Sequence, residues 1–197
     1  MKRSLLLMAA LLIVSAGTAS AARTSISDIW KDKEYQGPAT KIAVFCIMHD
    51  TVNRILYEDE FVRQFKARGV NAMPGYVVIP PDKFVEKDAA IEKMKALGVD
   101  AVLSTRLIDK IATETPVSKE ATSGSPNRPG FYEQVYDPKI REDNEPAYLE
   151  TNLLDLKRQQ RVWTVRSKTR LDRVNKDIFV GYIELILDKL ASDKMIK

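Results

Sequence analysis

The sequence predicts an α/β fold: a single domain of two or three layers, built on a mixed sheet. Apolar, strand-like runs alternate with two amphipathic stretches between residues 41 and 111, in the order β-α-β-α-β. Short turns join them, which indicates neighbouring parallel strands with right-handed crossovers. A long loop, a β-hairpin and a C-terminal helix are then expected, and the hairpin adds antiparallel strands to the sheet.

The elements of the first half follow from residue periodicity. Residues 42–48 form an unbroken apolar run, typical of a strand buried on both faces. Residues 54–68 carry apolar side chains at helical spacing and end at Gly69. The remaining elements of this half are expected as a strand over 70–79, a helix ending at 97 and a strand over 100–111.

The second half begins with an irregular stretch over residues 113–146 that is rich in proline. A loop of this length in a compact domain is usually functional or disordered. The hairpin strands are expected over 148–156 and 162–171, and the last helix over 177–190. Along the second hairpin strand apolar and basic residues alternate, which predicts a sheet with one face in water.

The N-terminus has the pattern of a secretory signal. Lys2 and Arg3 precede an apolar run, and Ala19-Ser20-Ala21 then offers a cleavage site between Ala21 and Ala22. The apolar run is about half the ~20 residues that a membrane-spanning helix needs. We therefore expect a signal peptide over 1–21, a polar lead-in over 22–40 and the ordered domain over 41–197. A periplasmic location follows, or secretion, without a transmembrane segment.

Charge and cysteine content exclude several classes of protein. The full chain has a formal net charge of +4, and removing the signal brings it closer to neutrality, so general binding of nucleic acid is not expected. Cys46 is the single cysteine, which excludes a disulfide framework. Because Ala22, and not a cysteine, follows the signal, no lipid anchor is expected either.

Two segments and the hairpin resemble a group of uncharacterised secreted bacterial proteins and putative lipoproteins. The segments are Lys66–Asp82 (KARGVNAMPGYVVIPPD) and Leu97–Leu107 (LGVDAVLSTRL), with Leu153–Trp163 in the hairpin. At fold level the group is similar to the periplasmic α/β domains of the curli-secretion lipoprotein, the penicillin-binding-protein activator lipoprotein and the Tol-Pal periplasmic protein. The resemblance implies a binding or assembly module and not an enzyme.

One candidate site is a strand-end pocket formed by His49, Asp50, Arg54 and Arg106. Ligands of parallel α/β sheets gather at the carboxyl ends of the strands, and the two arginines suit an anionic group. The alternative is a strand exit in which Asp50 or Thr51 caps the following helix. The turn lacks the glycines of nucleotide sites, and His49 has no Cys/His cluster around it, so neither a cofactor nor a metal is expected.

A second candidate is a basic stripe formed by Arg166, Lys168 and Arg170 along the last predicted strand. It could meet an acidic partner or an anionic envelope polymer. The alternative is a solvated strand face, partly neutralised by Glu150 across the hairpin.

The proline-rich loop supplies a third candidate, because Phe131, Tyr132 and Tyr136 would suit contact with a protein partner if they are exposed. The alternative is that these rings fold back onto the sheet.

Together these features predict a non-enzymatic exported binding or accessory protein that supports an envelope assembly through contacts with an envelope protein. A small-molecule binding protein or hydrolase using the strand-end pocket is the alternative function. Self-association through a sheet edge is a third possibility.

Overall fold

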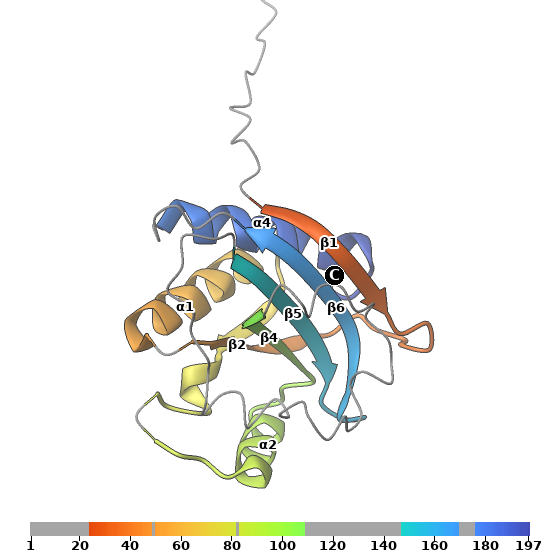
Figure 1. The fold of residues 1–197 in the computed structure, drawn as a ribbon. Coiled ribbons are helices and arrows are strands. Elements are labelled where there is room, and N and C mark those ends of the chain that lie inside the picture. The colour runs from red at the N-terminus through yellow and green to blue at the C-terminus, as the bar shows by residue number, and fades with distance from the viewer. Residues whose placement is uncertain (1–23, 49, 82, 109–146, 170–175) are drawn as a thin grey trace, which may run out of the picture.

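A computed structural model describes residues 24–48, 50–81, 83–108, 147–169 and 176–197. Its centre is a six-stranded sheet in the order β1-β6-β5-β4-β2-β3 (Figure 1). The strands are β1 (Thr24–Lys31), β2 (Lys41–Ile47), β3 (Asn71–Pro74), β4 (Ala101–Ile108), β5 (Ala147–Asp155) and β6 (Gln160–Thr169). The helices are α1 (Thr51–Ala67), the short 3-10 helix η1 (Gly75–Val77), α2 (Lys87–Ala96) and α4 (Lys176–Ser192). The predicted α/β class is confirmed.

The sheet has a parallel half and an antiparallel half. β2 pairs in parallel with both β3 and β4, as the order β-α-β-α-β predicts. β5 pairs antiparallel with β4 and with β6, so the hairpin extends the sheet beyond β4. The mixed sheet expected from the sequence is therefore confirmed, and the expected loop over 113–146 lies outside the described residues.

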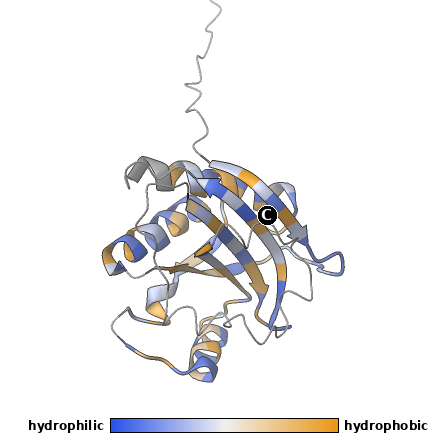
Figure 2. Ribbon diagram, in the orientation of Figure 1, coloured by the Kyte–Doolittle hydropathy of each residue, from blue (hydrophilic) through white to orange (hydrophobic). Residues whose placement is uncertain are grey.

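The helices divide the core into two layers on opposite faces of the sheet. α1 and α4 contact each other and cover one face. The apolar residues beneath them include Val44, Phe61, Phe65, Leu103, Trp163, Ile183 and Ile186. α2 covers a smaller core on the other face, which includes Ala43, Phe45, Ile91, Met94 and Val102. β2 is thus buried on both faces, as its unbroken apolar run predicts, whereas Figure 2 shows hydrophobic and hydrophilic residues alternating along the antiparallel strands.

The start of the sheet differs from the prediction. Residues 22–40 were expected to be a lead-in before a domain starting at Lys41, but β1 begins at Thr24 and pairs antiparallel with β6. A register shift between Ile26 and Asp28 leaves Ser27 unpaired, so that Ile26 and Ile29 oppose Ser167 and Val165 on one face. This bulge breaks the two-residue period by which a strand is detected in a sequence.

The strand expected over 70–79 is also shorter, because β3 ends at Pro74 and η1 follows it. Gly75 lies against the ring of Phe45, where an added β-carbon would be 2.4 Å from Phe45 Cδ1. The chain can turn into η1 at this point because glycine has no side chain to exclude the ring.

The Gly75→Ala variant should therefore lower the free energy of unfolding by about 1–3 kcal/mol, since the fully buried Phe45 has little room to shift. Gly181→Ala is the matched control, because Gly181 is an exposed residue of α4 with open space around its α-carbon. That control should be neutral or stabilising by up to about 1 kcal/mol. Urea unfolding measures both, and equal stability of the two variants would contradict the assigned contact.

Candidate functional site

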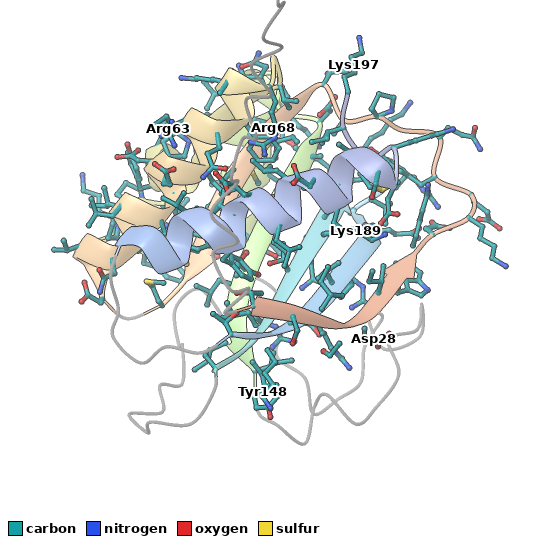
Figure 3. All side chains as sticks on the ribbon, turned by 90° about the horizontal axis from the view of Figure 1, so that it is seen from above. Asp28, Arg63, Arg68, Tyr148, Lys189 and Lys197 are labelled. Carbon is teal, nitrogen blue, oxygen red and sulfur yellow. The ribbon has the colours of Figure 1, made fainter. Side chains whose placement is uncertain are left out.

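A row of charged residues crosses four strands at one register. Arg106 of β4 lies opposite Glu150 of β5, Glu150 lies opposite Arg166 of β6, and Arg166 lies opposite Asp28 of β1. Directly opposite residues share a face of a sheet. The row is on the face away from α4, because the adjacent residues Thr105 of β4 and Thr151 of β5 lie on the other face. There the Thr105 hydroxyl is hydrogen-bonded to that of Thr151, and the Thr151 hydroxyl to that of Tyr182 on α4. Figure 3 shows Asp28 and Tyr148 on the side of the sheet away from α1.

Glu150 joins the two arginines of this row. Its Oε1 accepts hydrogen bonds from Arg106 Nη2 at 2.7 Å and Nε at 3.1 Å, and its Oε2 accepts one from Arg166 Nε at 2.9 Å. Arg166 is fully buried and Glu150 is 2% exposed, whereas the Arg106 side chain is 21% exposed. One buried carboxylate therefore fixes two guanidinium groups that belong to different strands.

The charge state of Glu150 follows from these contacts. Burial alone would raise the pKa of its carboxyl group, but the charges and hydrogen bonds of Arg106 and Arg166 outweigh burial and lower the pKa from 4.5 to about 2. Glu150 is thus ionised at neutral pH and is a poor general base, because a carboxylate with so low a pKa hardly takes up a proton.

We call the side of β1, β4, β5 and β6 that carries this row the polar face. Asn152 Nδ2 donates to Glu150 at 3.3 Å, and Thr164 Oγ1 donates to Asn152 at 2.7 Å. The Arg161 guanidinium lies 5.1 Å from the centre of the Trp30 ring. The described basic residues of this face are Arg106, Arg161, Arg166 and Lys168, and its described acidic residues are Asp28 and Glu150. Positive charge is therefore in excess.

The parallel and antiparallel halves of the sheet differ in which of their faces are covered by helices. α2 is the described helix on this side, and its apolar contacts extend over β2 and β4 as far as Leu154 and Leu156. Figure 1 shows β5, β6 and β1 facing the viewer, with α2 below them. Within the described part of the chain, the antiparallel half thus has helices on one face and polar side chains on the other.

The predicted basic stripe is only partly formed on this face. The expectation of a solvated Arg166 is wrong, because Arg166 is buried against Glu150, and the expected neutralisation by Glu150 is confirmed. Lys168 is exposed. Arg170 lies outside the described residues, as do the predicted loop contacts Phe131, Tyr132 and Tyr136.

The predicted strand-end pocket does not bring its two arginines to one anion. Asp50 caps α1 by accepting from the backbone N–H of Asn53 at 3.0 Å, which confirms the capping alternative. Arg54 Nε binds Glu58 Oε1 at 2.9 Å, and its Nη2 donates to the carbonyl of Ile79 at 2.9 Å. Arg106 binds Glu150 instead. His49 lies outside the described residues.

Glu58 connects three elements at this end of the sheet. It is fully buried, and besides Arg54 it accepts the backbone N–H groups of Cys46 at 3.1 Å and Tyr76 at 2.8 Å. Burial raises the pKa of Glu58 despite the opposing effect of Arg54. This ion pair holds β2, α1 and η1 together, which is a structural role.

Cys46 matches the prediction of a buried apolar residue. Its side chain is buried, and burial raises the pKa of its thiol well above 9, so the thiolate that a nucleophile requires is disfavoured. Among the described residues no group of three or more His, Cys, Asp or Glu side chains could hold a metal ion. The described helices are each too short or too polar to cross a membrane.

Sequence reasoning missed the burial of the charged row. The opposite signs of Glu150 and Arg166 across the hairpin were visible, and they indicated a pair. Alternation assigns residues to a face but does not reveal whether that face is open to water. The place of Asp28 in the row could not be foreseen without β1.

Comparison with known proteins finds only distant structural similarity. No family model and no curated protein matches the chain. Two structures of PelC dodecamers from Paraburkholderia phytofirmans are similar. One is 13% identical, with 83% of this chain and 95% of that chain covered and a TM-score of 0.46. The other is 12% identical, with coverages of 88% and 99% and a TM-score of 0.46. At these values the likeness carries no inference about function, and the expected resemblance to the curli-secretion and penicillin-binding-protein activator lipoproteins stays a prediction.

The Glu150→Gln variant should lower the free energy of unfolding by about 3–5 kcal/mol at neutral pH, because it leaves two arginines without their shared carboxylate. The matched control is Glu92→Gln on α2, whose ion pair with Lys95 is exposed and should contribute less than about 1 kcal/mol. Chemical unfolding measures the difference. Similar losses in the two variants would contradict a stabilising role for Glu150.

The difference in stability between the wild type and Glu150→Gln should depend on pH. The folded pKa of about 2 lies below the ordinary value of 4.5, so the stabilisation is fully present above pH 4.5 and is lost as the pH falls towards 2. Unfolding of both proteins between pH 6 and pH 2 tests this. A difference that does not change with pH would show that the carboxylate charge is not responsible.

The role of Asp50 as a helix cap is also testable. Asp50→Ala should cost about 1 kcal/mol of stability, whereas Asp50→Asn should cost little, because an asparagine side chain can still accept from the backbone of Asn53. Thermal unfolding compares the two variants. Equal losses in both would indicate that the charge of Asp50, and not its hydrogen bond, matters.

Proposed function

We propose that this chain is an exported, non-enzymatic accessory protein that binds an acidic protein partner of the cell envelope through its polar face. The observation that carries the proposal is the excess of positive charge on a sheet face whose central ion cluster is fixed in place. The signal-like N-terminus supports export, and the periplasm is the expected location.

The chemistry of the described polar residues favours binding over catalysis. Glu150 is held ionised by two arginines, and Cys46 is buried with its thiol protonated. Arg54 is bound to Glu58 and to a backbone carbonyl, which leaves the strand-end alternative without its expected anion site. These groups stabilise the fold and are poorly suited to proton transfer or nucleophilic attack.

The accessible part of the polar face has the character of a protein interface. Lys168 is exposed, and Trp30, Arg106, Tyr148 and Asn152 are partly exposed around the buried centre. Aromatic and arginine side chains are enriched at protein interfaces. The excess of positive charge complements an acidic surface and would steer it to this face. Phe131, Tyr132 and Tyr136 remain predicted contacts of the same partner.

A photoreactive amino acid at position 168 tests this function in the host cell. We expect crosslinking to one dominant envelope protein at position 168, and none to that protein at position 66, since Lys66 is exposed on α1 on the opposite side of the sheet. An acidic surface on the captured protein is part of the expectation. Equal capture at both positions, or no capture at position 168, would contradict the proposal.

A further inference from the structure

The two edges of the sheet are built differently. β3 forms one edge, and it is four residues long and ends at Pro74, which lacks a backbone N–H. β1 forms the other edge and is eight residues long (Figure 1). An edge strand leaves every second backbone N–H and C=O without a partner strand, and another chain can pair with these groups. β1 is therefore the edge that is long enough to accept an added strand.

The outward-facing groups of β1 follow from its register with β6. Asp32, directly after β1, donates its backbone N–H to the carbonyl of Val162 at 2.8 Å. Inward-facing and outward-facing residues alternate in an antiparallel pair, so Asp28 also directs its backbone groups toward β6. In this second half of the strand, Ile29 and Lys31 therefore direct their backbone groups away from the sheet.

One of these two outward N–H groups is already occupied. The backbone N–H of Ile29 donates to Oδ1 of Asp28 at 2.8 Å. The Asp28 side chain thus takes the place that a carbonyl of an added strand would need. The outward N–H of Lys31, in contrast, has no acceptor within the described ranges of the chain.

The rest of β1 keeps this arrangement in place. The bulge at Ser27 makes the strand irregular, which hinders the approach of a straight partner strand. At the start of β1, the hydroxyls of Thr24 and Thr169 are hydrogen-bonded at 3.0 Å. At its end, Lys31 Nζ donates to the carbonyl of Asp193, just after α4, at 2.6 Å. β1 is thus anchored at both ends and held in one register.

We propose that the Asp28 side chain protects the β1 edge from pairing with a second copy of this chain. A second copy is the expected occupant of an unprotected edge, because it carries the identical strand and a twofold axis allows two such strands to pair antiparallel. The protecting feature is the hydrogen bond from Ile29, and not the negative charge of Asp28. This role does not depend on the function proposed for the polar face.

Two substitutions at position 28 separate the hydrogen bond from the charge. Asp28→Val removes both and favours extended backbone, so it should self-associate. Its weight-average mass at high concentration should be about twice that of the wild type. Asp28→Asn keeps an oxygen that accepts from Ile29 and should have the wild-type mass. Sedimentation equilibrium of the full chain, purified after export, measures both. A wild-type mass for Asp28→Val, or association of Asp28→Asn, would overturn the proposal.

A second substitution tests whether the association uses the β1 edge. Ile29→Pro, added to Asp28→Val, removes the outward N–H without breaking a bond to β6, and edge strands tolerate proline at such positions. The double variant should return to the wild-type mass, and continued association would contradict pairing through β1. Circular dichroism checks that each variant is folded.

Amide hydrogen exchange of the wild type tests the hydrogen bond directly, and its result does not require Asp28→Val to fold. After correction for intrinsic rates, the Ile29 N–H should exchange about threefold to tenfold more slowly than the Lys31 N–H, because one net hydrogen bond protects it. Equal corrected rates at the two positions would overturn the proposed role of Asp28.

Discussion

The bridge from Glu150 to Arg106 and Arg166 is the interaction on which the antiparallel half of the sheet depends. Buried charges are tolerated only when each has its partner, because desolvation is costly. A slip of one residue between strands would move Glu150 to the other face and leave two arginines unpaired. The bridge thus favours one register for β4, β5 and β6. That same register brings Thr105 and Thr151 under Tyr182 on the opposite face.

This arrangement gives the molecule two unlike sides. The side with α1 and α4 is closed by an apolar core. The other side has α2 over the parallel strands and the polar face, with its excess of positive charge, over the antiparallel strands. The binding function proposed for the polar face requires a rigid surface, and the bridge holds the centre of that face in place.

Much of the fold could be predicted because the relevant signals are local. The apolar run of β2, the spacing in α1 and the stop at Gly69 are each readable within a few residues. Asp50 could be identified as a possible helix cap from its residue type alone.

The strand β1 could not be predicted, because the bulge at Ser27 interrupts its two-residue period. The prediction of one long strand over 70–79 is wrong. The chain leaves β3 where Gly75 contacts Phe45, and a contact between residues so far apart in the sequence cannot be read from a local pattern. A pattern identifies a face and not its burial, so it predicts accessible charges at Arg54 and Arg166, and the structure buries both.

A double-mutant cycle between Glu150 and Arg166 tests the central claim most directly. The free energy of unfolding would be measured for the wild type, Glu150→Gln, Arg166→Met and the double variant. If the bridge organises the sheet, the double variant should lose about 1–3 kcal/mol less than the sum of the single losses. Losses that add to within about 0.5 kcal/mol would mean that the two residues act independently, and would contradict this account of the polar face.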